Sequence, residues 1–148
     1  PLFVQSYPIT SDDEWRLSTP HAETHLCHHL VLATWRRTGG FGRAEGEAIA
    51  GRWRKIQEEA RMVVQKVSFV PDHVHLAVHV HPSVSPAELV TVLMNTAQEL
   101  CWKDFGPSAV RAGIERLWQP CAYLGSYGEL ESPKIAAYIR RWEEDSQT

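Results

Sequence analysis

Alternating and helical hydrophobic patterns divide the first half of the chain into recognisable segments. Apolar residues from 43 to 64 recur at spacings of three and four, which predicts an amphipathic helix. Only Pro71 and Asp72 separate two extended runs, so we expect a tight antiparallel hairpin there. Three extended apolar runs predict strands: residues 26–35 (LCHHLVLATW), 63–71 (VVQKVSFVP) and 73–82 (HVHLAVHVHP).

The second half of the chain continues the pattern with two helices and one strand. A helix-start signal at 85–88 (SPAE) leads into an apolar series that predicts a helix to about Trp102. Residues 103–117 are compatible with a short helix and with a long connection. The run 121–127 (CAYLGSY) predicts a strand, and a second Ser-Pro signal predicts a final helix over 132–145.

The order of these elements indicates the fold class. It is βαββαβ followed by a C-terminal helix, which is typical of an α+β fold with a ferredoxin-like or RRM-like antiparallel sheet and helices on one face. Residues 1–24 contain three prolines and an acidic cluster without a sustained period, so we expect an irregular N-terminal arm. Residues 25–148 are expected to form a single domain.

Composition excludes several classes of protein. Of the 148 residues 43% are hydrophobic, and no apolar run approaches the length of a membrane span, which excludes transmembrane and disordered proteins. Three cysteines without a CxxC pair fit neither a disulfide scaffold nor a cysteine zinc ribbon. The N-terminus does not resemble a secretory signal, so we expect a cytoplasmic protein in a reducing compartment.

Charge is distributed unevenly along the chain. The net charge is −3, but residues 35–66 hold eight basic residues and four acidic ones. Such a stretch suits a phosphate-facing surface and also an ordinary solvated helix face. The candidates for contacts to a nucleic-acid backbone in this stretch are Arg36, Arg37, Arg52, Arg54 and Lys55.

The densest chemical signal is a series of histidines in PDHVHLAVHVHP. His73, His75, His79 and His81 share one face of the predicted strand. His73 and His79 would be about 20 Å apart, so the four rings cannot bind one ion. The pair nearest the turn, His73 and His75, is the candidate metal site, and solvent-facing histidines on a half-exposed strand are the alternative.

These residues resemble a known family. The stretch VSFVPDHVHLAVHVHPSVSPAELV is similar to the HUH motif (His, bulky apolar, His) of the single-tyrosine HUH transposases, which include the REP-associated tyrosine transposases. HHLVLATWRR resembles the first strand of that family. LWQPCAYLGSYG and the later AAYIRRW resemble its closing strand and its tyrosine-bearing helix. The resemblance spans residues 26–144 in the order and spacing of the family.

The resemblance implies an activity and a set of roles. His73 and His75 would bind Mg²⁺ or Mn²⁺, and Tyr138 on the C-terminal helix would be the nucleophile. The enzyme would act on single-stranded DNA with hairpin ends as a nucleoid-associated transposase, through a 5′-phosphotyrosine intermediate and a free 3′ hydroxyl. An edge-paired homodimer is also implied.

One position departs from the family pattern. The family commonly has a glutamine metal ligand four residues after the tyrosine, and that position here is Trp142. Helical spacing puts Asp145 two turns beyond Tyr138, so we expect Asp145, or less well Glu143, to be the third ligand. On the same face, Lys134 or Arg141 would activate the tyrosine or hold a phosphate. Tyr123 and Tyr127 are weaker candidates for the nucleophile.

Two other functions remain open at this point. A catalytically degenerate relative would bind hairpin DNA as a regulator or accessory protein. A plain α+β domain would bind a metal ion through its histidine strand. A zinc cluster of Cys27, His28 and His29 is disfavoured because neighbouring residues on a strand point to opposite faces.

Overall fold

An antiparallel sheet of five strands organises the fold, in the order β1-β3-β4-β2-β5. The computed structural model describes residues 3–22, 24, 26–34, 42–111 and 118–126. The elements are β1 (Phe3–Ser6), α1 (Ser11–Leu17), β2 (Leu26–Thr34), α2 (Arg43–Ile56), β3 (Met62–Val70), β4 (His73–Val80), α3 (Pro86–Arg111) and β5 (Trp118–Ser126).

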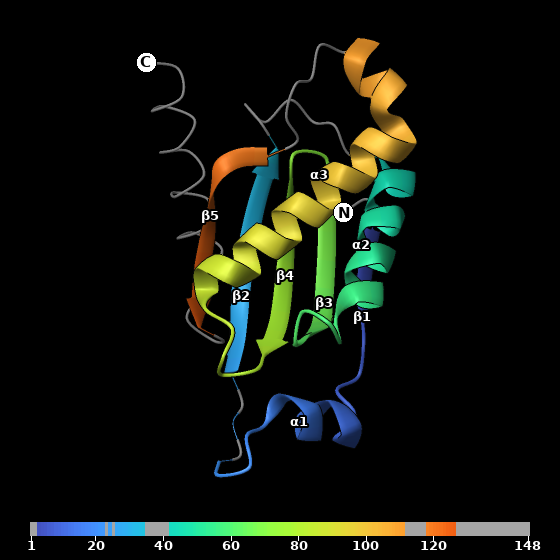
Figure 1. Ribbon diagram of the computed structural model, residues 1–148. Coiled ribbons are helices and arrows are strands. Elements are labelled where there is room, and N and C mark those ends of the chain that lie inside the picture. Colours follow the sequence, from blue (N-terminus) through green and yellow to red (C-terminus); the bar gives the residue numbers. More distant parts are fainter. Residues whose placement is uncertain (1–2, 23, 25, 35–41, 112–117, 127–148) are drawn as a thin grey trace.

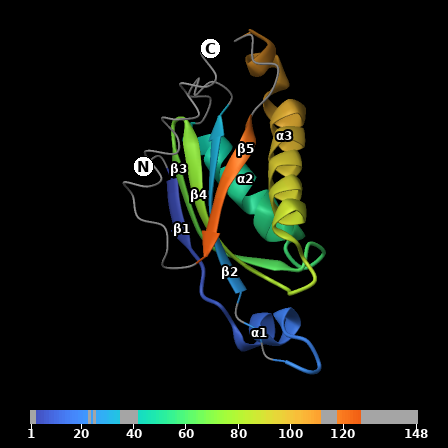
Figure 2. The same cartoon turned by 90° about the vertical axis from the view of Figure 1, so that its left-hand side faces the viewer.

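The predicted ferredoxin-like core is confirmed. From β2 to β5 the elements follow the order βαββαβ, and all strand pairings are antiparallel. Helices α2 and α3 lie over the same face of the sheet (Figure 1 and Figure 2). Every second residue of β4 from Val74 to Val80 is buried toward these helices, as are Leu30 and Leu32 of β2. The hydrophobic core therefore lies between the sheet and the two helices.

Two tryptophans of the core form hydrogen bonds to the backbone of α3. Trp53 of α2 is fully buried, and its indole Nε1 donates to the Leu93 carbonyl of α3 at 2.9 Å. Trp118 at the start of β5 donates in the same way to the Met94 carbonyl at 3.0 Å. Each bond satisfies the one polar atom of a large apolar ring, so both tryptophans act as core residues that join a neighbouring element to α3.

The N-terminal arm is not irregular, which corrects the prediction for residues 1–24. β1 pairs with β3, with Phe3 opposite Phe69, and adds a fifth strand to the sheet. Thr10 and Asp13 form a reciprocal capping box that starts α1. Arg16 donates to the Met62 carbonyl at 3.0 Å, which ties α1 to the start of β3.

Element boundaries also differ from the prediction in three places. α2 ends at Ile56, because a turn with Arg61 at φ 54° intervenes before β3. α3 extends to Arg111, which makes 103–111 helical. β5 begins at Trp118, three residues earlier than expected. The predicted C-terminal helix over 132–145 lies outside the described residues.

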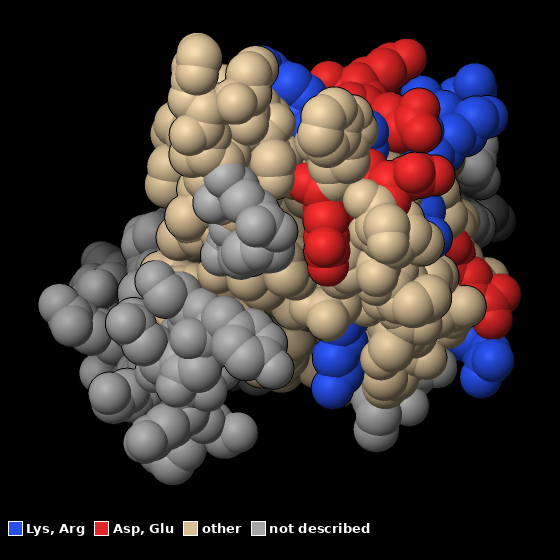
Figure 3. Space-filling model, turned by 90° about the horizontal axis from the view of Figure 1, so that it is seen from below, with Lys and Arg blue, Asp and Glu red and all other residues tan. Residues whose placement is uncertain are grey.

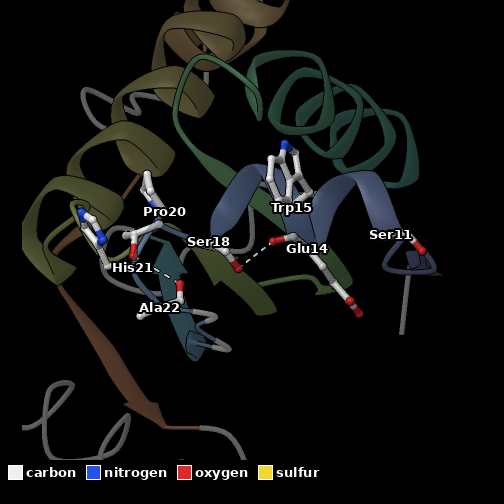
Figure 4. A pocket seen from close by; sticks show the side chains of 8 residues that line it. Ser11, Glu14, Trp15, Ser18, Pro20, His21 and Ala22 are labelled. Atoms are coloured by element: carbon white, nitrogen blue, oxygen red, sulfur yellow. Dashed lines mark hydrogen bonds between the residues drawn. The ribbon is translucent and has the colours of Figure 1, made fainter.

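The end of the molecule that carries α1 has mixed charge. Among the described residues, acidic and basic side chains lie side by side mainly over the right half of this view (Figure 3). A cavity of about 500 Å³ lies between α1 and the turn that follows it, and Trp15 at its rim is 85% exposed (Figure 4). Among the described residues, no helix has the length and apolar character needed to cross a membrane.

Candidate functional site

The histidines lie on the sheet face opposite α2 and α3, which we call the histidine face. In β4, Val74, Leu76, Val78 and Val80 are buried on the helix side. The alternation of a strand therefore turns the intervening histidines to the other side. β4 is the central strand of the five, so the histidine face is flanked by two strands on each side.

His73 and His75 form a close pair at the turn end of β4. Their ring centroids are 5.0 Å apart in an edge-to-face arrangement. His73 Nδ1 lies 2.7 Å from the Asp72 carboxylate. With Asp72 as the acceptor, Nδ1 carries the proton and Nε2 keeps its lone pair. Proteins commonly orient a metal-binding histidine in this way, through a carboxylate that accepts from the ring nitrogen not bound to the metal.

The second histidine of the pair is held in its neutral form. Burial lowers the pKa of His75 to about 4. The nearby charges of His73, His29 and Lys66 lower it in the same direction, since a positive neighbour disfavours the imidazolium. A neutral imidazole at pH 7 is the form that binds a metal ion.

The remaining histidines of the series have other partners. His79 Nε2 lies 2.8 Å from Gln65 Oε1, and His81 Nδ1 lies 2.7 Å from Ser83 Oγ. The series therefore divides into the pair at the turn and two rings engaged elsewhere. His73 and His75 stay the candidate metal site.

The described residues do not complete a metal site. They contain no group of three His, Cys, Asp or Glu side chains arranged to hold an ion. Cys27, His28 and His29 do not form such a group either. His28 faces the helix side with Leu30, whereas Cys27 and His29 face the histidine side. The predicted third ligand Asp145 and its alternative Glu143 lie outside the described residues, as do Tyr138, Tyr127, Lys134 and Arg141.

One candidate tyrosine does lie on the histidine face. Cross-strand pairing aligns residues of all five strands in a row that we call the His75 row: Val4, Ser68, His75, Val31 and Tyr123. Tyr123 is thus two strands from His75, about 10 Å between backbones. Its neighbours Ala122 and Leu124 pack against the core on the other side. Tyr123 stays a weaker candidate for the nucleophile.

The basic residues of α2 lie on the opposite side of the sheet from the histidines. Arg52 and Lys55 are exposed there. Arg54 is occupied, since its guanidinium donates to the Val64 carbonyl at 3.3 Å and lies 4.0 Å from the Tyr7 ring centroid. The structure does not bring these three to the histidine pair. Arg36 and Arg37 lie outside the described residues.

The structure adds Lys66 and Ser68 to the site, which the sequence analysis did not connect with it, and it brings His29 near His75 because β2 and β4 are neighbouring strands. His29, Lys66 and Ser68 line a cavity of about 380 Å³ together with His75. A β-bulge between Val64 and Lys66 shifts the register of β3 at this point. The bulge lets Val64 and Val67 both face the core while Lys66 faces the histidines. In the sequence, the irregular spacing of apolar residues in VVQKV was the signal that could have indicated this bulge.

Comparison with known proteins gives matches in sequence pattern and in fold. A family model described as IS200-like transposase matches residues 22–142. A search by sequence found no match among curated proteins.

Two solved structures are similar to this one. A candidate transposase from Deinococcus radiodurans R1 superposes with a TM-score of 0.76 at 19% identity, over 84% of this chain and 95% of that one. A REP-associated tyrosine transposase bound to a REP hairpin superposes with a TM-score of 0.50 at 7% identity, over 82% of this chain and 68% of that one. At identities this low, the superpositions show a shared fold alone.

Proposed function

Because the chain belongs to the IS200-like transposase family, we propose that it is a metal-dependent transposase that cuts and rejoins single-stranded DNA. The family that the HUH motif indicated is confirmed by the match over residues 22–142. The observation that carries the proposal is the His73–His75 pair at the turn end of the central strand, with ring centroids 5.0 Å apart.

The donor set of the pair fits a divalent metal ion. His73 is oriented by Asp72, and the low pKa of His75 keeps its imidazole neutral. A Mg²⁺ or Mn²⁺ ion bound there would polarise the scissile phosphate and offset negative charge in the transition state. Asp145 is proposed as the third protein ligand.

Tyr138 is proposed as the nucleophile. Its phenol oxygen forms a bond to the phosphorus, and the bond from phosphorus to the 3′ oxygen breaks. The 3′ oxygen leaves and takes up a proton, while the phenol proton passes to solvent. The 5′-phosphotyrosine conserves the phosphodiester bond, so attack by a 3′ hydroxyl reverses the step and joins strands without ATP.

A covalent-adduct assay tests this mechanism. Protein and end-labelled single-stranded hairpin DNA from the genomic flanks are incubated with Mn²⁺ or Mg²⁺ and separated on a denaturing gel. We expect a labelled protein band in the wild type, and its loss in Tyr138→Phe and His75→Ala. The matched control is His81→Ala, because the His81 ring bonds Ser83 away from the pair and should leave the band intact.

Other outcomes distinguish the alternatives. A band that persists in Tyr138→Phe and disappears in Tyr123→Phe would transfer the nucleophilic role to Tyr123, which shares the His75 row. Tight DNA binding without any band would indicate a degenerate relative that acts as a binding protein. Metal binding without DNA binding would indicate the plain metal-binding domain.

The proposed partners are DNA and a second copy of the chain. One relative in fold is bound to a REP hairpin, so we propose a hairpin-containing single strand as the ligand here. Arg36 and Arg37, with the proposed phosphate contacts Lys134 and Arg141, would hold its backbone. A homodimer joined at sheet edges is proposed as the working form, and sedimentation equilibrium measures it.

A further inference from the structure

A groove of about 380 Å³ opens on the histidine face beside the metal-ligand pair. β1, β2, β3 and β4 all contribute to it, and we call it the Lys66 groove. Its volume lies within the range of small-molecule sites. The residues that line it are Val4, His29, Lys66, Ser68, His75, Leu76 and Ala77.

The chemistry of the Lys66 groove favours an anion. Lys66, Ser68 and His29 each carry a hydrogen-bond donor, and none of the seven lining residues is acidic. Within the described part of the chain, no carboxylate forms an ion pair with Lys66. The ammonium charge of Lys66 is therefore available to a ligand.

The groove also has an apolar wall. Val4 is 48% exposed on the short strand β1, and Ala77 lies across the sheet on β4. A phosphate alone needs no such wall, whereas a nucleotide presents a charged phosphate beside a less polar sugar and base. The combination matches one nucleotide of a single strand.

The groove lies at a fixed position relative to the histidine pair. Ser68 is directly opposite His75 across the β3–β4 ladder, and Lys66 is opposite Ala77. Lys66 and His75 are thus diagonal neighbours, with backbones about 7–8 Å apart. That offset is of the order of one nucleotide step along an extended strand.

We propose that the Lys66 groove binds the DNA phosphate adjacent to the scissile phosphate, with Lys66 and Ser68 as its ligands. The proposal rests on the proposed function, because the histidine pair must hold the scissile phosphate. Lys66 is a positioning residue here. It fixes which phosphodiester of the strand lies over His73 and His75 and thereby sets the register of cleavage.

The test measures binding without cleavage. Anisotropy of a labelled hairpin single strand is recorded in a Tyr138→Phe background, at several salt concentrations and without metal. Replacing Lys66 with Gln should weaken binding about tenfold at low salt and reduce the salt slope by about 1. The matched control is Lys103→Gln, because Lys103 is exposed on α3 on the other side of the sheet. This variant should keep the wild-type affinity and the wild-type salt slope.

A chemical change in the DNA identifies the phosphate. Neutral methylphosphonates are placed one at a time along the strand. At the position next to the scissile phosphate, the substitution should weaken binding to the wild-type groove and have little further effect on the Lys66→Gln variant. Calorimetric Mn²⁺ affinity should be unchanged in that variant, which separates the groove from the metal ligands.

The outcomes separate this inference from the proposed function. Equal affinity and equal salt slope in Lys66→Gln and wild type would overturn the groove assignment, even if the covalent adduct forms. So would a methylphosphonate scan in which no position loses its effect in the variant. Failure of both the adduct and all single-strand binding would overturn the proposed function, and the inference with it.

Discussion

At the scale of single residues, the candidate site depends on two imidazoles with different supports. His73 is oriented by the Asp72 carboxylate 2.7 Å away, and His75 is kept neutral by burial. The HxH spacing after a Pro-Asp turn was sufficient to predict the pair. It was not sufficient to predict Lys66, because strict alternation from Val64 would turn Lys66 toward the core, and only the bulge turns it to the histidines.

Asp72 should contribute to metal affinity although it is not proposed as a ligand. In Asp72→Asn the acceptor of the His73 Nδ1 proton loses its charge, so the ring is held less firmly and is less basic at Nε2. We expect Mn²⁺ affinity to fall about 10- to 100-fold by calorimetry. Asp12→Asn on α1 is the control, and equal affinities in the three proteins would contradict the role of Asp72.

Stability without metal should fall in mild acid through His75. Its folded-state pKa of about 4 lies below the ordinary value of 6.5, so the unfolded chain takes up a proton that the folded chain does not. The free energy of unfolding therefore decreases as pH falls from 7 toward 4, by about 2 kcal/mol from this group after solvent screening of the partly exposed ring is discounted.

Urea denaturation between pH 4 and 7 measures this dependence. His75→Gln should reduce the slope of unfolding free energy against pH. His81→Gln, whose ring bonds Ser83 beyond the end of β4, should retain it. A slope that is the same in His75→Gln as in the wild type would show that His75 titrates alike in both states.

At the scale of elements, sequence patterns predicted those helices and strands that carry their own signal. The β3–β4 hairpin has its Pro-Asp turn, and α3 has its Ser-Pro-x-Glu start. β1 was missed because four residues, FVQS, are too few to show a period, and they become a strand only by pairing with β3. Residues 63–64 fell in both the predicted helix and the predicted strand, because apolar helix and strand patterns overlap there.

Two glycines of α2 should respond oppositely to the same substitution. A Cβ on Gly46 would lie 3.2 Å from the Phe69 ring, whereas a Cβ on Gly51 meets nothing within 4 Å. Gly51→Ala should therefore stabilise the protein by about 0.5–1 kcal/mol through helix propensity. Gly46→Ala should destabilise it by about 1–2 kcal/mol. Urea denaturation compares the two, and equal shifts would contradict the close packing of α2 on β3.

At the scale of the whole molecule, the sheet separates two tasks. Its helix side contains the core, and its histidine side carries the candidate chemistry. The ferredoxin-like topology was predictable because it follows from element order. The Lys66 groove was not predictable, because it needs β1 at the edge of the sheet. β1 pairs with a strand that is far from it in the sequence, as Val4 pairs with Ser68.

The N-terminal strand should contribute to global stability through Phe3. This ring packs against the core with its centroid 6.3 Å from that of Phe69. Phe3→Ala should lower the free energy of unfolding by about 2 kcal/mol. Val4→Thr, at an exposed position that keeps a β-branched side chain, is the control and should change it by less than about 0.5 kcal/mol. Equal stability of Phe3→Ala and wild type would contradict this role.

The tight turn at Pro71 and Asp72 has a consequence for the order of folding. Loop closure favours contacts between residues close in sequence, so we expect the β3–β4 hairpin to form early. β2 must find β5 across most of the chain, as Val31 pairs with Tyr123. His73 and His75, the candidate metal ligands, are then in their relative positions before the long-range pairings that complete the sheet around them.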